Sequence, residues 1–197
     1  MAQVPLPLRL AADAALAAIR GFAADQRGGI TIESVLILPL FTYWYIGTFV
    51  FFDLFRMASI NEKAAYAVSD AISRSPPGEA LQDPDFEGYN SLFDYLVSNR
   101  GTSRMRVTSI VYNSGAARYD REWSVGTRGV VALTAEEVNL LGPSLPVMGG
   151  GETVVLVETF LDYTPPMNVG LPARQFRTFI FTRPRLAIRV CYIACPT

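Results

Sequence analysis

The sequence predicts an α+β protein in which a long N-terminal helix crosses a membrane and continues into a small domain with a four-stranded antiparallel sheet and short helices. Three observations favour this fold class. Residues 34–52 form an uncharged, mainly apolar run. Apolar residues at helical spacing continue beyond this run to about residue 74. In residues 75–197, segments of alternating apolar and polar residues indicate strands.

The uncharged run is long enough to be a transmembrane helix. It has nineteen residues, SVLILPLFTYWYIGTFVFF, and about twenty mainly apolar residues cross the hydrocarbon core of a bilayer. A buried core helix is the alternative. A helix that is apolar on every side needs a large protein to cover it, however, and the rest of this 197-residue chain is small. We therefore expect residues 34–52 to contact the lipid bilayer.

Residues 1–28 form an alanine-rich leader whose basic residues outnumber its acidic ones. These are Arg9, Arg20 and Arg27 against Asp13 and Asp25. Positive charge beside a transmembrane helix keeps that side in the cytoplasm, so the N-terminus is expected there and the C-terminal domain in the periplasm. A secretory signal is the alternative, but the apolar run exceeds the roughly 7–15 residues of a signal peptide and no A-x-A-like site follows it.

The helix is expected to extend over residues 29–74 and to end at the breaker cluster SRSPPG, residues 73–78. Such a helix is about 65 Å long, of which the bilayer needs about 30 Å. The remainder carries an apolar stripe that packs either on the chain's own domain or on partner subunits. Its members are Met57, Ile60, Ala64, Ala67 and Ala71.

Residues 75–197 are predicted to form the small domain. The helices are expected over 85–99 and from Thr134, where Glu137 completes a capping box. The strands are expected over 105–112, 117–125, 152–163 and 176–190. Pro184 lacks an N–H group, so the last strand is expected to bend there or to lie at an edge.

The composition argues against several functional classes. The chain has no histidine, which removes the commonest general base and metal ligand. Its net charge of −1 and the lack of a basic run argue against nucleic-acid binding. No nucleophile elbow or phosphate-binding loop occurs, so we expect neither an enzyme nor a cofactor.

One acidic segment has a weak resemblance to a calcium loop. Asp83, Asp85, Glu87 and Asp94 occupy positions 1, 3, 5 and 12 of an EF-hand-like pattern. The last position should be a glutamate, Pro84 stands at position 2, and residues 75–78 exclude the entering helix. The favoured interpretation is therefore an acidic turn that caps a helix starting near Asp85, without a metal.

The two cysteines, Cys191 and Cys195, lie near the C-terminus. Along a strand their Cα atoms would be about 13 Å apart, at a rise of about 3.3 Å per residue. A disulfide requires less than about 7 Å, so pairing needs a turn through residues 192–194. Both the paired and the free state remain open at this point.

The segment that joins the leader to the apolar run, RGGITIE at residues 27–33, contains a glutamate at the head of a membrane helix. Such a carboxylate is costly, which suggests a function. The spacing of Gly28 and Glu33 resembles the prepilin-peptidase site of type IV pilin-like proteins. This resemblance implies cleavage between Gly28 and Gly29, with Glu33 as the fifth mature residue. Its carboxylate would then neutralise the new α-amine or that of a neighbouring subunit.

Further motifs resemble the TadE-like family. Residues 33–39 (ESVLILP) are similar to the family's E-F-A-L-x-L-P opening and depart from it at the second and third positions. Pro39 in this segment is expected to kink or soften the helix. Residues 154–166 and 182–186 resemble the family's V-x-E-x-x-x-x-Y-x-P strand and its late R-P-R. Residues 75–150 match no family motif.

The resemblance implies a minor pilin-like subunit, without enzymatic activity, that is required to assemble a Tad/Flp-type pilus for surface adherence. Its implied partners are prepilin peptidase, other pilin-like subunits and pilus-assembly components in the bacterial inner membrane. An uncleaved, membrane-anchored periplasmic binding or sensor module is the alternative, and the fate of Gly28 distinguishes the two.

Overall fold

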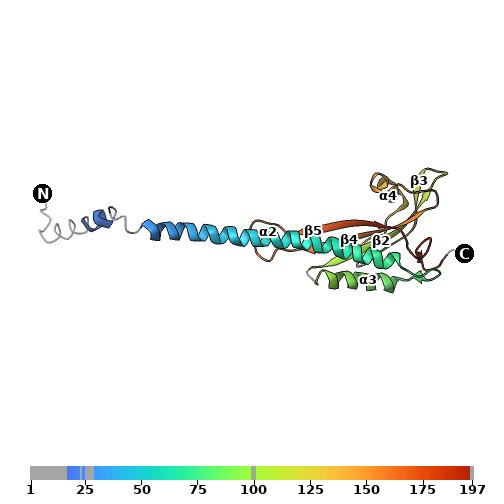
Figure 1. Ribbon diagram of the computed structural model, residues 1–197, viewed down its shortest axis with the longest axis horizontal. Helices are drawn as coiled ribbons and strands as arrows, with labels where there is room; N and C mark the ends of the chain where they lie inside the picture. Colours follow the sequence, from blue (N-terminus) through green and yellow to red (C-terminus); the bar gives the residue numbers. More distant parts are fainter. Residues whose placement is uncertain (1–16, 23, 25–28, 99–100, 196–197) are drawn as a thin grey trace, which may run out of the picture. The chain divides into compact units, whose positions relative to one another are not determined.

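The computed structural model describes residues 17–22, 24, 29–98 and 101–195 (Figure 1). The chain divides into two compact units, and the boundary lies inside the long helix α2, between Phe49 and Val50. We call residues 50–197 the C-terminal unit. The predicted α+β class, with one long apolar N-terminal helix and a four-stranded antiparallel sheet, is confirmed.

Helix α2 is described over Gly29–Ser73 and continues through Pro39. Proline has no N–H, so one carbonyl of the preceding turn lacks its helical donor there. The helix ends where the sequence predicts. The amides of Arg74 and Ser75 bond to carbonyls three residues back, which tightens the last turn, and two prolines follow.

The sheet has the order β3-β2-β4-β5, and every neighbouring pair is antiparallel. Its strands are β2 (Ser103–Asn113), β3 (Arg118–Gly126), β4 (Thr153–Tyr163) and β5 (Arg174–Thr182). The alternation of apolar and polar residues locates all four. Between β2 and β3 the chain turns over residues 114–117, and Ala117 adopts a left-handed conformation with φ 48°.

The prediction of one strand over residues 176–190 is wrong in its second half. Strand β5 ends at Thr182, since Pro184 has no donor for the ladder. The following residues use their backbone groups elsewhere: the amide of Arg185 bonds to the carbonyl of Ser73, and the carbonyl of Val190 accepts from the Trp123 indole. A short strand β6 (Cys191–Tyr192) then pairs in parallel with β1 (Ala80–Leu81), a pairing that the sequence did not reveal.

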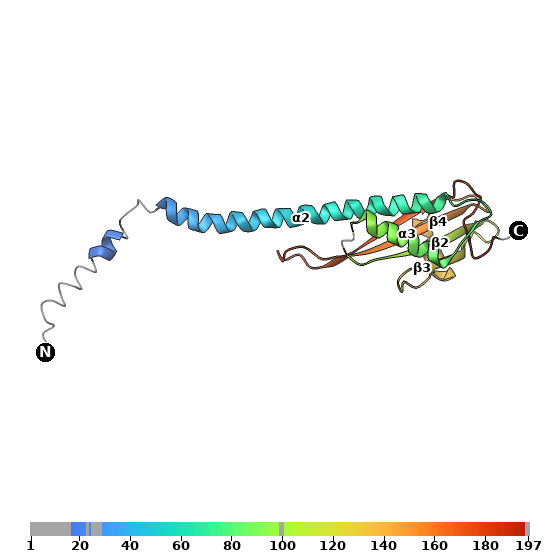
Figure 2. The same ribbon diagram turned by 90° about the horizontal axis from the view of Figure 1, so that it is seen from below.

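Within the C-terminal unit, α2 and α3 (Asp83–Leu96) lie on one face of the sheet (Figure 2). The main core lies between these two helices and the sheet, and alternate residues of the strands contribute to it. It includes Met57, Val68, Ile72, Phe86, Phe93, Val107, Val157 and Leu161. The opposite residues of β4, Val154 and Leu156, belong to a second cluster under α4 (Ala135–Leu140). The sheet is therefore buried on both faces at the start of β4.

Capping interactions fix the starts of both short helices. Thr134 and Glu137 form the predicted capping box of α4. Helix α3 begins two residues earlier than predicted, and the Gln82 amide donates to the Asp85 carboxylate over 2.8 Å. The tight turn η2 (Gly142–Ser144) follows α4.

Candidate functional site

The predicted processing motif lies at the start of α2. Gly28 lies outside the described residues. Gly29 is the first described residue of α2, and the side chain of Glu33 is exposed. Residues four apart in a helix share a face, so the Gly29 nitrogen and the Glu33 side chain lie one turn apart on the same side. An α-amine at Gly29 would therefore be within reach of the Glu33 carboxylate.

The uncharged run has the surface of a helix suited to a lipid environment. By length and composition, α2 is apolar and long enough to cross a membrane. Its large apolar side chains are exposed, Leu36 at 70% among them. The hydroxyls of Ser34, Thr42 and Thr48 each donate to the carbonyl four residues back, over 2.7, 2.7 and 2.9 Å. Hydrogen bonds to the helix's own backbone satisfy these groups without water.

Three polar contacts, which we call the polar rungs, join α2 to the sheet within the C-terminal unit. They are Tyr163 Oη to Asp53 Oδ2 (2.9 Å), Asn61 Nδ2 to Thr178 Oγ1 (2.7 Å), and Ser69 Oγ with Thr182 Oγ1 (2.5 Å). On α2 the rungs are eight residues apart, about 12 Å along the axis. Four residues of β5 separate Thr178 from Thr182, which is about 13 Å. The helix and strand repeats therefore match, and the rungs set the register of α2 on the sheet.

The apolar stripe expected on α2 serves mainly the chain's own core. Met57 and Ala64 are buried in that core, Ile60 packs against it, and Ala67 is exposed. The rung residues of α2 were missed because polar residues usually mark a solvated face. The spacing held a signal, however: Asn61 lies four residues after Met57 and three before Ala64, which puts it on the apolar face.

A buried ionic cluster lies on the other face of the sheet. Glu158 of β4 is fully buried and accepts hydrogen bonds from Arg106 of β2 (2.5 Å) and Arg177 of β5 (2.8 Å). The Arg177 guanidinium also stacks over Phe179, 4.4 Å from its centroid. Two arginines satisfy one carboxylate here, so this cluster ties three strands together.

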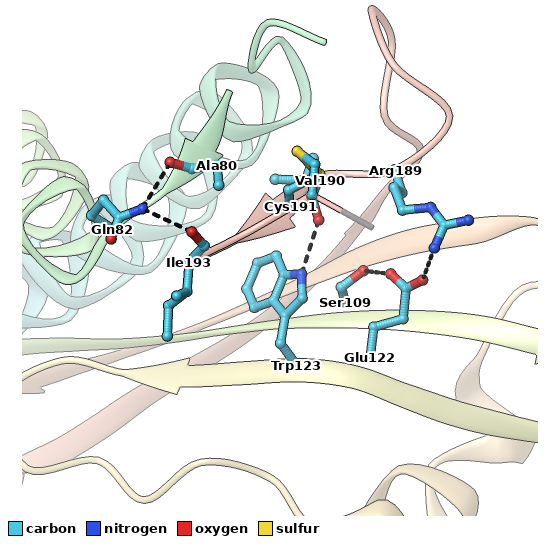
Figure 3. Close-up of a disulfide and its surroundings, with 10 residues drawn as sticks. Ala80, Gln82, Ser109, Glu122, Trp123, Arg189, Val190, Cys191 and Ile193 are labelled. Atoms are coloured by element: carbon cyan, nitrogen blue, oxygen red, sulfur yellow. Dashed lines mark hydrogen bonds and ion pairs between the residues drawn. A yellow bond between two sulfur atoms is a disulfide. The ribbon is translucent and has the colours of Figure 1, made fainter. Parts of the chain in front are cut away.

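The C-terminal cysteines form a disulfide between Cys191 and Cys195, with their Cα atoms 5.1 Å apart. The chain makes the required turn at Ile193, which has φ 62°, and the Ala194 amide bonds to the Tyr192 carbonyl. The disulfide lies beside the Trp123 indole, which donates to the Val190 carbonyl over 2.9 Å (Figure 3). It therefore closes the loop that carries β6 against β1.

The four carboxylates of the calcium-like pattern do not form a loop. Asp83, Asp85, Glu87 and Asp94 all lie in helix α3, which contradicts the loop geometry. Each has a protein partner: Asp83 accepts from Tyr192, Asp85 caps Gln82, and Arg128 lies beside both Glu87 and Asp94. In the described part of the chain, no group of three or more His, Cys, Asp or Glu side chains is placed to hold a metal ion.

Two tyrosine hydroxyls near helix α3 have raised pKa values, those of Tyr192 and Tyr89. The hydrogen bond from Tyr192 to Asp83 is the main cause that raises the pKa of Tyr192 above 10.0. Burial raises the pKa of Tyr89, which the Ser75 hydroxyl partly offsets. Tyr89 lines a cavity of about 550 Å³ between the end of α2 and α3, together with Arg74, Ser75 and Asp85. This hollow is open, and its lining is mixed, with polar and apolar side chains in similar shares.

Comparison of the chain with protein-family models, with curated proteins and with solved structures finds no match.

Proposed function

We propose that this chain is a minor pilin-like subunit of the TadE type, anchored in the bacterial inner membrane and required to assemble a Tad/Flp-type pilus. One observation carries the proposal. The RGGITIE segment, residues 27–33, precedes the uncharged run in the sequence, and its described part, from Gly29, belongs to a single helix, α2, that holds this run and then forms part of the core of an α+β unit. This combination supports a subunit whose anchor is also its assembly element.

In the proposed mechanism, prepilin peptidase cleaves between Gly28 and Gly29 on the cytoplasmic side. The new α-amine is cationic, and the Glu33 carboxylate one turn along α2 neutralises it or its counterpart on a neighbouring subunit. In a low-dielectric membrane, an unpaired charge is costly, so this pairing favours the neighbour in the correct register. The periplasmic C-terminal unit then docks on other pilus components.

The test is the intact mass and N-terminal sequence of the full chain, extracted from membranes of cells with and without prepilin peptidase. We expect a mature N-terminus at Gly29 only when the peptidase is present. A Gly28→Leu variant should remain uncleaved. Gly21→Leu is the matched control, since it alters a leader glycine outside the motif that has open space around its Cβ position. A chain that keeps residues 1–28 in every case would overturn the proposal.

A second experiment separates processing from assembly. Glu33→Gln keeps the size of the side chain and removes its charge. We expect this variant to be cleaved normally but to lose cross-linking to neighbouring subunits in the membrane. Cross-linking equal to that of the unaltered chain would refute the role given to Glu33.

The uncleaved periplasmic binding or sensor module is the second candidate. The hollow lined by Ser75, Asp85 and Tyr89 favours it, since an open cavity of about 550 Å³ with both polar and apolar lining is large enough for a small ligand. Retention of the leader in the mass experiment would make this candidate the better account.

A further inference from the structure

The loop between β4 and β5, residues 164–173, is uncharged throughout. Its sequence is TPPMNVGLPA, with three prolines, a methionine, a valine and a leucine among ten residues. Met167 is 52% exposed, and Pro166 and Pro172 are exposed as well. Val169 and Leu171 are half-buried, so the exposed apolar surface of the loop consists mainly of Met167 and the two prolines, and contiguous apolar surface of this kind is typical of interaction sites.

This loop leaves the sheet at the level where the uncharged run of α2 ends. Asp53 is the first charged residue after that run, and its carboxylate accepts the hydrogen bond from Tyr163, the last residue of β4. Strand β4 runs from the level of Ser69 toward Asp53, so the loop lies at the end of the C-terminal unit where α2 enters it (Figures 1 and 2).

The two parts of the loop differ in packing. Leu171 packs against the main core, while Met167 remains exposed. The charges lie on the sheet side: Arg174 is exposed at the start of β5, and Arg104 pairs with Asp162 over 2.9 Å. An apolar tip with a charged base is suited to the boundary between water and lipid, and Arg174 is suited to anionic headgroups.

We propose that loop 164–173 contacts the lipid surface of the membrane that α2 crosses, so that the C-terminal unit has a second, shallow membrane contact. This inference rests on the membrane anchoring in the proposed function. The contact would hold the C-terminal unit close to the bilayer.

The test uses the full-length, oxidised chain in vesicles of phosphatidylethanolamine and phosphatidylglycerol. Three variants each carry a fluorescent label on one added cysteine, because Cys191 and Cys195 are joined in the disulfide. They are Met167→Cys in the loop, Leu40→Cys in the uncharged run, and Val147→Cys as the control. Val147 is 93% exposed and precedes β4, at the far end of that strand from the loop. Lipids with a nitroxide near the headgroup and iodide in the water serve as quenchers.

We expect shallow nitroxide lipids to quench the label at residue 167 and to leave the label at residue 147 unaffected. Iodide should quench residue 147 strongly and residue 167 weakly. If residues 167 and 147 behave alike while residue 40 is lipid-exposed, the loop contact is wrong and the anchor stands. Protection of residue 167 from both quenchers would indicate a protein partner, such as a second copy, and would also overturn the proposal. An iodide-accessible label at residue 40 would refute the anchor itself and the loop contact with it.

Discussion

Asn61 of α2 donates a hydrogen bond to Thr178 of β5 over 2.7 Å, and this contact is the middle one of the three polar rungs. Asn61 is 1% exposed. The Asn61 Nδ2 group has this partner, and a buried N–H donor that loses its partner is strongly unfavourable, while the Asn61 Oδ1 atom has no hydrogen-bond partner among the described residues. Any other register of α2 on the sheet would separate Asn61 from Thr178 and would therefore be less stable. The contribution of the rungs can be measured as a change in the free energy of unfolding.

Asn61→Ala should destabilise the C-terminal unit by about 0.5–1.5 kcal/mol, the net value of a hydrogen bond, because the half-buried Thr178 hydroxyl loses its donor. Unfolding can be followed by Trp123 fluorescence in a Trp44→Phe background, since the chain has 2 tryptophans. Ser59→Ala is the matched control on the exposed side of α2 and should change little. Equal effects of the two substitutions would contradict the role of the rung.

Glu158→Gln should be among the most damaging single substitutions in the sheet, at about 3–5 kcal/mol, because it leaves Arg106 charged and only 11% exposed at its side chain. Asp162→Asn, on the same face of β4, weakens a half-exposed pair with Arg104 and should cost about 1 kcal/mol. Denaturant unfolding measures both values. A Glu158→Gln protein as stable as Asp162→Asn would show that the cluster contributes no net stability.

Replacing both Cys191 and Cys195 by serine should lower stability by about 2 kcal/mol, the value expected for a loop of about five residues. The local effect should be larger than the global one. Trp123 donates to Val190 and lies 5.8 Å from the Tyr192 ring, so its emission should shift toward longer wavelength when this segment loosens. The same shift should appear when the unaltered chain is treated with a thiol reductant. Unchanged emission in both cases would mean that β6 stays paired with β1 without the disulfide.

The capping box of α4 predicts a pH dependence. The hydrogen bond from the Thr134 amide is the main cause that lowers the pKa of Glu137 below 4.5. A lowered folded-state pKa means that the contribution of Glu137 is fully present above about pH 4.5 and is lost as the pH falls through the lowered value. NMR titration of the carboxyl carbon checks this direction.

Thr134→Ala removes the hydroxyl but keeps the backbone amide, so the pKa of Glu137 should rise only part of the way toward 4.5. The lost cap should cost about 1 kcal/mol. A full return of the pKa would show that the hydroxyl, and not the amide, is the main cause.

Elements marked by a repeated pattern or a sharp change in composition were predictable from the sequence. Two-residue strands and single contacts between distant residues were not. The SRSPPG cluster gave the C-terminal end of α2, because a change in chain chemistry marks it. Alternation located the four strands, since successive side chains of a strand lie on opposite faces of the sheet. The predicted helix start at Thr134 needed only a local pattern, the capping box.

The pairing of β1 with β6 was not predictable because each strand has 2 residues, too few to show a period. The segment 183–190 alternates like a strand but binds its backbone to Ser73 and Trp123, contacts that only tertiary structure provides. The contact between Asp53 and Tyr163 was missed for the same reason, since the two residues lie 110 positions apart in the sequence.

The polar rungs also have a mechanical consequence. All three cross from α2 to the sheet, so a force directed along the helix axis shears them at the same time and no single contact bears it alone. A force that lifts one end of the helix would instead peel them off in sequence. If α2 is the element by which neighbouring subunits pull on this one, the C-terminal unit is built to resist traction along that helix far better than leverage across it.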